Sequence, residues 1–264
     1  MKEDTDSFEE LIRFIQDEEA TSSHIELDKD KEIVYMRCSK QRFQKILRAI
    51  TQSSQPLKIL DIGTTPFTCL IKRTYPHYEV TTIDRTNLLE KRCKSWGVGL
   101  VACDLDKGTI PFEDDIFDVI IFTEVLEHII APPKQIVQEL KRVLKKGGKL
   151  IMSTPNIARL NKRIGLLLGQ SPLPPPDKQL KNNWVHGHGH IREYTKKEII
   201  SLLNSCDMII DKIEFLQPSI SSLYSLASVK GLPHYLLRVL NHAFVSWYPP
   251  FRAIIYAECH KAAD

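Results

Sequence analysis

FDVIIFTEVLEH, residues 117–128, decides the fold, because two similar stretches precede it. They are LKILDIG at residues 57–63 and EVTTID at residues 79–84. All three are short apolar runs that contain or end in acidic residues. In an open parallel sheet the carboxyl ends of the strands face the ligand crevice, so carboxylates placed there can bind hydroxyl and amine groups of one molecule. The pattern favours a site for a nucleoside-containing cofactor.

From residue 57 onward, β-rich runs alternate with helical ones, which predicts parallel strands joined by crossover helices. The clearest helix is expected at residues 133–146, since Pro133 stands at its start and Gly147 and Gly148 follow its basic last turn. Thr195 is expected to cap a helix over residues 196–206. Strand patterns at residues 208–216 and 253–260 are expected to pair antiparallel at one edge of the sheet.

The length of 264 residues suits one α/β core with added segments. We expect an N-terminal helical cap over residues 1–50 and the main domain over residues 51–264. Substrate-side insertions are expected at about residues 156–194 and 217–250. The second insertion is apolar enough to contact a membrane surface or to pack on the sheet.

Charge and cysteine content bear on the partners of the protein and on its cellular compartment. The 36 basic and 33 acidic residues give a net charge of +3, too small an excess to predict a nucleic-acid partner. The six cysteines include no CxxC pair and are expected to be free thiols in a reducing compartment. The acidic N-terminus lacks a secretory pattern, and no apolar run is long enough to span a membrane. We expect a cytoplasmic protein and leave its oligomeric state open.

The loop at residues 61–67, DIGTTPF, resembles that of the class I S-adenosylmethionine (SAM)-dependent methyltransferases. A glycine directly after a strand lets backbone approach a ligand, and a following helix N-terminus offers free N–H donors. The resemblance implies SAM as cofactor and a Rossmann-like three-layer α/β/α sandwich, with a mostly parallel seven-stranded sheet and an antiparallel last strand. It places Asp61, Gly63 and Thr64 beside the methionine part of SAM. Thr65 and Phe67 stand where the family usually has two further glycines.

Three more positions are expected to contact the cofactor. Asp84 ends the second strand about twenty residues on, where a carboxylate can accept hydrogen bonds from a ribose diol. The resemblance implies that Asp104 accepts the adenine amine, with the backbone of Leu105 alongside, although Asp104 also suits the opening of a turn. Thr123, at the end of the 117–123 run, completes the set.

IPFEDDIFD, residues 110–118, resembles the family's stretch that leads into the fourth strand. We expect its role to be structural, with Phe112 and Phe117 packing beneath the sheet.

Glu124, Glu127 and His128 are spaced so that one helical turn would carry all three on one face. Such carboxylates and an imidazole could bind a divalent metal, with His190 the best guess among three later histidines for a further ligand. The pattern is similar to that of small-RNA terminal ribose methyltransferases, which use a metal there. It is equally similar to ubiquinone-pathway O-methyltransferases and to small-molecule methyltransferases that share E-x-L-E-H. A solvated helix start without metal is the alternative.

The function expected from these features is O-methylation of a small-molecule or lipid-linked acceptor, with His128 as general base and Glu124 beside it. A metal-dependent RNA ribose 2′-O-methyltransferase is the second hypothesis, and the absence of a dense basic stripe counts against it. The third is a noncatalytic scaffold in which Thr65 and Phe67 close the cofactor loop.

Overall fold

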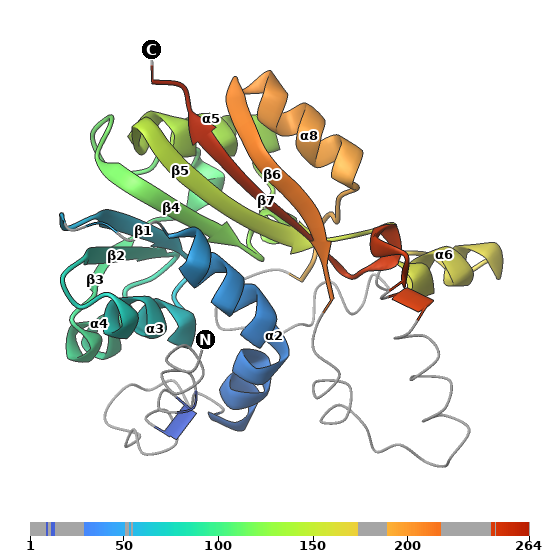
Figure 1. The fold of residues 1–264 in the computed structure, drawn as a ribbon, viewed down its shortest axis with the longest axis horizontal. Coiled ribbons are helices and arrows are strands. Elements are labelled where there is room, and N and C mark those ends of the chain that lie inside the picture. Colours follow the sequence, from blue (N-terminus) through green and yellow to red (C-terminus); the bar gives the residue numbers. More distant parts are fainter. Residues whose placement is uncertain are drawn as a thin grey trace. The chain divides into compact units, whose positions relative to one another are not determined.

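The computed structural model describes residues 9, 12–13, 29–50, 53, 55–173, 189–217, 244–245 and 247–263. Its seven strands form one sheet in the order β3-β2-β1-β4-β5-β7-β6 (Figure 1). The pairs β1–β2, β2–β3 and β4–β5 are parallel, whereas β7 runs antiparallel to both β5 and β6. The expected Rossmann-like α/β fold with an antiparallel last strand is therefore confirmed.

The chain groups into two compact units. The first comprises Met1–Ala102 with Pro218–Val229, and the second comprises Cys103–Gln217 with Lys230–Asp264. The expected boundary between a cap and a main domain near residue 50 stays a prediction.

The first unit alternates helices and strands as the sequence predicts. Its elements are α2 (Lys29–Ala49), β1 (Lys58–Ile62), α3 (Pro66–Thr74), β2 (Glu79–Asp84), α4 (Glu90–Trp96) and β3 (Gly99–Ala102). Phe67 of α3 is buried and stacks on Phe43 of α2, with ring centroids 4.2 Å apart. Arg92 of α4 forms a bidentate ion pair with Glu32 of α2, in which Nη1 and Nη2 donate to Oε1 and Oε2 at 2.7 and 2.8 Å. These contacts pack the N-terminal helix against the elements that follow β1 and β2.

The second unit carries the remaining strands and the helices that cover them. Its elements are η1 (Leu105–Lys107), β4 (Phe117–Thr123), η2 (Leu126–His128), α5 (Pro133–Val143), β5 (Leu144–Pro155), α6 (Leu160–Leu167), α8 (Lys196–Ser205), β6 (Met208–Leu216), η3 (Pro249–Phe251) and β7 (Ile254–Lys261). Helices α5 and α8 contact each other, and they pack on β5 and β6 respectively (Figure 1). Thr195 caps α8 in a reciprocal pair with Glu198, as predicted.

The helix expected over residues 133–146 ends at Val143, so its predicted end was wrong. Leu144 is already extended, at φ −80° and ψ 131°, and is fully buried. It pairs with Phe117 at the start of β4, and its carbonyl accepts a hydrogen bond from Lys261 at 2.8 Å. These long-range contacts override the helical pattern of the last turn.

The expected antiparallel edge pair is confirmed, with a refinement. Strand β6 lies at the edge and pairs with β7, while β7 also pairs antiparallel with β5. Residues 254–261 are therefore an inner strand, which explains why their side chains are mostly buried or half-buried.

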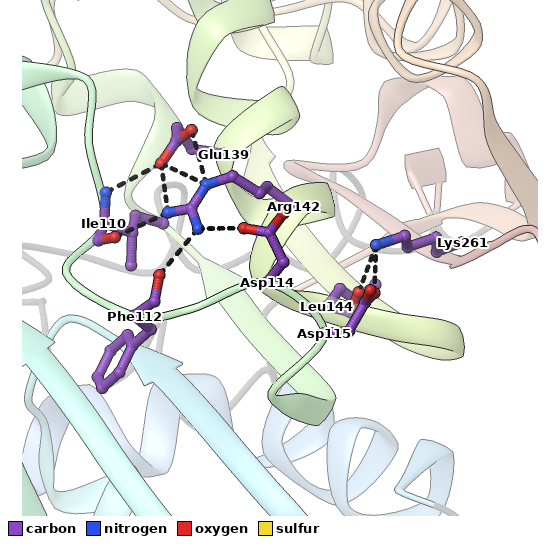
Figure 2. A network of polar contacts seen from close by, with 8 residues as sticks. All are labelled: Ile110, Phe112, Asp114, Asp115, Glu139, Arg142, Leu144 and Lys261. Carbon is purple, nitrogen blue, oxygen red and sulfur yellow. Dashed lines mark hydrogen bonds and ion pairs between the residues drawn. The ribbon is translucent and has the colours of Figure 1, made fainter.

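The stretch at residues 110–118 is held by Arg142 of α5, as Figure 2 shows. The guanidinium donates to the carbonyls of Ile110 and Phe112, each at 2.8 Å, and to the carboxylates of Asp114 and Glu139. Phe112 packs edge-on against buried Phe117, with ring centroids 4.9 Å apart. This structural role matches the sequence prediction.

Three other expectations concern the cysteines, membrane-spanning helices and the two insertions. The six cysteines are thiols that take part in no disulfide, and four of them are buried. Within the described ranges, none of the helices has the length and apolar content needed to cross a membrane. Residues 174–188 and 218–243, which make up much of both expected insertions, lie outside the described residues.

Candidate functional site

The turn after β1 is the part of the first unit best suited to approach a ligand. Gly63 has φ +87°, a left-handed conformation that glycine adopts without strain. Its N–H donates to the carbonyl of Ile83 in β2 at 2.9 Å. Thr65 then caps α3 and Pro66 is the first helical residue, as their order in the sequence predicts. The turn therefore presents backbone next to the N-terminus of α3.

Phe67 does not occupy this turn, because its ring lies against Phe43 in the packing between α2 and α3. The expectation that Phe67 could close the cofactor loop is therefore wrong. The cause is the long N-terminal helix, which supplies an aromatic partner that the loop sequence alone could not reveal.

Asp61 is the buried carboxylate of this turn, with 3% of its surface exposed. Burial raises the pKa of Asp61 from 3.8 to about 7, and a hydrogen bond from the Thr68 hydroxyl at 2.6 Å offsets part of that rise. The same hydroxyl accepts from the N–H of Thr65. Thr68 thus links the carboxylate to the helix cap. Sequence reasoning missed this residue.

Asp84 stands at the end of β2, in register beside the Gly63 turn. It is 7% exposed, and its Oδ2 accepts a hydrogen bond from the N–H of Thr64 at 3.1 Å. Four of the predicted cofactor contacts, Asp61, Gly63, Thr64 and Asp84, therefore lie together at the carboxyl ends of two neighbouring parallel strands.

This cluster fits a ligand that carries both a cation and hydroxyl groups. The raised pKa of Asp61 reflects a carboxylate withdrawn from water, and a positively charged ligand group would favour its ionised form. Carboxylates at strand ends are also suited to accept hydrogen bonds from a sugar diol. The amino acid and ribose parts of SAM have these groups.

The other predicted cofactor contacts, Asp104, Leu105 and Thr123, belong to the second unit. Asp104 accepts from the N–H of Asp106 at 3.2 Å and so caps the short η1 turn that Leu105 begins. Thr123 is the last residue of β4 and is half-buried. Asp104 thus has the turn-forming role weighed from the sequence, and the contacts of all three with a cofactor stay predictions.

The segment after β4 differs from the single helical turn that the spacing of Glu124, Glu127 and His128 suggested. Glu124 has φ +56°, which redirects the chain before the one-turn helix η2. Its Oε1 accepts from the Ser153 hydroxyl at 2.8 Å, whereas Glu127 accepts from Thr154 at 3.0 Å. The expected shared helix face is therefore wrong, because left-handed backbone at Glu124 breaks the helical spacing.

Glu127, His128 and His190 nevertheless come together. They offer ligand atoms that all lie within 4.8 Å of one another, and this group does not include Glu124. The two imidazole rings meet edge-on with centroids 4.9 Å apart. The Glu127 carbonyl accepts from the N–H of Ile191 at 2.7 Å, which fixes the His190 segment beside η2. The other two histidines of the 186–190 run lie outside the described residues.

Glu193 is a second residue that sequence reasoning missed. Its carboxylate is 4% exposed and lies 3.1 Å from Nδ1 of His190. Burial alone would raise the pKa of Glu193, but hydrogen bonds from His190 and Lys162, together with the charge of Arg159, lower it to about 2. The only signal in the sequence was the spacing of His190 and Glu193, which has no meaning before the local structure is known.

Comparison with known proteins agrees with this architecture. Residues 60–152 match the model of a family described as the methyltransferase domain. This part of the chain is therefore similar to a methyltransferase domain, and the chain around it has the Rossmann-like fold of the class I enzymes. The matched region begins in β1 and ends in β5, so it includes the glycine turn, Asp84 and the η2 segment.

Curated relatives resemble the chain over short regions. A malonyl-[acyl-carrier protein] O-methyltransferase from Paenibacillus sp. (strain JDR-2) is 30% identical over 106 residues, covering 37% of this chain and 38% of its own length. A demethylmenaquinone methyltransferase from Thermotoga maritima is 32% identical over 118 residues, covering 41% of this chain and 49% of its own. The matches thus span less than half of either relative.

Solved structures extend the likeness to most of the chain. A SAM-dependent methyltransferase from Methanosarcina mazei superposes with a TM-score of 0.56 and 18% identity, covering 83% of this chain and 98% of the other. This similarity concerns the fold. The chain therefore has the predicted architecture, while the roles of its individual residues rest on the geometry described above.

Proposed function

We propose that this protein is a SAM-dependent methyltransferase that methylates a hydroxyl group of a small-molecule or lipid-linked acceptor. The observation that carries the proposal is the pair of buried carboxylates, Asp61 and Asp84, beside the left-handed turn at Gly63 within a methyltransferase domain. The packing of Phe67 against Phe43 leaves the noncatalytic alternative without its main argument.

Each predicted cofactor residue has a distinct task in this proposal. Asp61 accepts from the ammonium group of SAM, and the backbone at Gly63 and Thr64 approaches its methionine part. Asp84 accepts from the ribose hydroxyls. Asp104 and the N–H of Leu105 bind the adenine, and Thr123 contributes a further contact. When bound, SAM supplies a methyl group that its sulfonium has already activated.

The residues around η2 serve the acceptor. His128 would take the proton from the acceptor hydroxyl, so that the oxygen could receive the methyl group of bound SAM. The S–CH3 bond would break, leaving neutral S-adenosylhomocysteine and a methyl ether, with the proton on His128. The His128 side chain is 37% exposed, which leaves it accessible to an acceptor. Glu124, held by Ser153, places a negative charge beside the reacting group. The E-x-L-E-H pattern supports placing the chain with small-molecule methyltransferases.

The names of the two relatives support this acceptor class. One acts on a malonyl group carried by an acyl-carrier protein, and the other is named for demethylmenaquinone. Both names describe carrier-linked or lipophilic acceptors rather than nucleic acids. The exposed apolar side chains of α6, Ile164, Leu166 and Leu167, would suit an acceptor of this kind.

A metal-dependent RNA ribose methyltransferase is the second candidate, favoured by the Glu127, His128 and His190 cluster. One carboxylate and two imidazoles fit the preferences of a divalent transition metal. These three residues would hold the ion, which would bind and polarise the ribose hydroxyls. Glu124 is outside the cluster, so the four-ligand set expected from the sequence would need rearrangement. The small net charge of +3 favours the first candidate.

A labelled-methyl assay tests this function. The chain is incubated with SAM carrying a tritiated methyl group and with three acceptors in separate reactions: malonyl-acyl carrier protein, reduced demethylmenaquinone and a short RNA. We expect label in reduced demethylmenaquinone, which carries hydroxyl groups that His128 can deprotonate, without added metal. Label only in malonyl-acyl carrier protein would mark a carboxylate acceptor, which needs no general base, and would contradict the proposed hydroxyl chemistry. We expect the double variant Glu124→Gln, His128→Asn to lower the rate roughly 10²- to 10⁴-fold, the range that general-base catalysis supplies.

The matched control is the double variant Asp211→Asn, His260→Asn, which makes the same kind of change at a partly exposed carboxylate–histidine pair on β6 and β7. It is expected to keep full activity. Full activity in the Glu124, His128 variant would contradict the proposed chemistry. Label only in RNA, and only with added metal, would favour the second candidate.

A further inference from the structure

The buried charge cluster around Glu193 has no task in the methyl transfer proposed above. Glu193 lies between three basic side chains: Nδ1 of His190 at 3.1 Å, Nζ of Lys162 at 2.7 Å and Arg159 at 3.5 Å. Its own side chain is only 4% exposed. A buried carboxylate is costly unless it is paired, so this arrangement needs its partners.

The segment that carries His190 and Glu193 is fixed by backbone at both ends. The Glu127 carbonyl accepts from Ile191 and, at 3.3 Å, from Arg192. Tyr194 bridges to the end of β5, donating to the Pro155 carbonyl at 3.4 Å and accepting from Ile157 at 3.0 Å. Residues 190–194 are therefore held in place by these backbone hydrogen bonds, and Glu193 contacts His190 within this segment.

The contact constrains where the imidazole carries its proton. Lys162 and Arg159 keep Glu193 ionised, and an ionised carboxylate can only accept hydrogen bonds. The Nδ1 atom facing Glu193 must therefore be the donor. In a neutral imidazole the other nitrogen, Nε2, then holds the lone pair.

We propose that Glu193 is a positioning residue that holds His190 in the Nδ1–H tautomer, so that the lone pair of Nε2 serves the cluster formed with Glu127 and His128. Carboxylates orient histidines in this way where an imidazole must act as a base or ligand. In this chain the pairing also sets the orientation of the His190 ring relative to His128.

Lys162 and Arg159 contact the same carboxylate and neutralise most of its charge. In the neutral ring, the carboxylate of Glu193 directs the single proton to Nδ1. Arg159 is the residue before α6, and Lys162 lies in its first turn. The start of this helix therefore supplies both cations that contact Glu193.

The role given to the Nε2 lone pair rests on the proposed function. The tautomer of His190 can be measured without assuming that function. Nitrogen NMR of protein labelled with ¹⁵N-histidine distinguishes the two tautomers from the shifts of the ring nitrogens. The spectrum is recorded at about pH 8.5, roughly two units above the ordinary histidine pKa, so that neutral rings dominate. The signal of His190 is assigned as the one lost in His190→Asn. We expect the Nδ1–H tautomer to exceed the other at least about tenfold, since the bond is charge-assisted.

Glu193→Gln is the decisive variant, because an amide of the same shape can donate as well as accept. We expect it to erase most of the tenfold preference while leaving the other histidine signals in place. Asp211→Asn is the matched control: it alters a similar carboxylate contact, 2.8 Å from Nδ1 of His260, and should change the His260 signal alone.

Two results would overturn the inference. One is an Nε2–H signal for His190 in the wild type, which needs only the His190→Asn assignment and is informative even if Glu193→Gln unfolds. The other is a folded Glu193→Gln protein with an unchanged tautomer ratio. Neither result depends on methyl transfer, so a failure here is distinguishable from a failure of the proposed function.

Discussion

Asp61→Asn is expected to stabilise the protein at pH 8 and, at the same time, to weaken its binding of S-adenosylhomocysteine. Burial raises the pKa of Asp61 to about 7 in the folded state, against 3.8 without burial. Between these values the folded protein binds a proton that the unfolded chain has lost, so the free energy of unfolding falls as pH rises. At pH 8 the ionised carboxylate costs on the order of a few kcal/mol.

Asparagine removes that cost, because it has no charge to bury and its carbonyl can still accept from Thr68. Urea unfolding at pH 5 and pH 8 measures the effect. The wild type should lose stability between these values by on the order of a few kcal/mol more than Asp61→Asn does. Loss of the carboxylate that receives the ammonium group should weaken ligand binding roughly tenfold to a hundredfold.

Glu79→Gln is the control for Asp61→Asn, since Glu79 is an exposed carboxylate at the opposite end of β2. It should change neither the pH dependence of stability nor ligand binding. Equal pH slopes for the wild type and Asp61→Asn would show that Asp61 titrates normally. Unchanged binding in Asp61→Asn would remove this residue from the cofactor site.

Arg142→Met is expected to destabilise the fold by roughly 2–4 kcal/mol, the scale of several lost charge-assisted hydrogen bonds. The guanidinium holds two carbonyls and two carboxylates of the second unit, as Figure 2 shows. Its hydrogen bonds lower the pKa of Glu139, which in turn accepts from the N–H of Ile110. Methionine keeps the apolar stem but leaves the carbonyls of Ile110 and Phe112 without these donors.

The control for Arg142→Met is Lys145→Met. This variant removes the ion pair between Lys145 and Asp118, the last residue of the 110–118 stretch. That pair is partly exposed, so its loss should cost less than about 1 kcal/mol. Both variants are compared by urea unfolding at pH 7. An Arg142→Met loss no larger than that of Lys145→Met would mean that the network does not anchor residues 110–118.

Local sequence signals predicted much of the cofactor half of the molecule. Thr65 and Pro66 mark the start of α3, and the acidic ends of β1 and β2 lie where the alternation of strands and helices places them. These features depend on short-range chemistry: a cap, a proline without an N–H and a glycine that adopts positive φ.

The acceptor half was predicted less well, because its geometry depends on contacts between segments far apart in sequence. The positive φ of Glu124 removed it from the Glu127 and His128 cluster, although spacing alone placed the three together. Glu193 matters because the bridge between Tyr194 and Asn156 brings its segment to the end of β5. Neither feature has a local signature that could have revealed it.

Calorimetric titration of the metal-stripped protein with S-adenosylhomocysteine, for the wild type and for Asp84→Ala, tests whether the carboxylates beside the Gly63 turn bind the cofactor. We predict binding to the wild type and a loss of roughly a hundredfold or more in Asp84→Ala, since two hydrogen bonds to a carboxylate disappear. Glu79→Gln should bind as the wild type does. A folded wild type that does not bind, or an Asp84→Ala variant that binds equally well, would contradict that prediction.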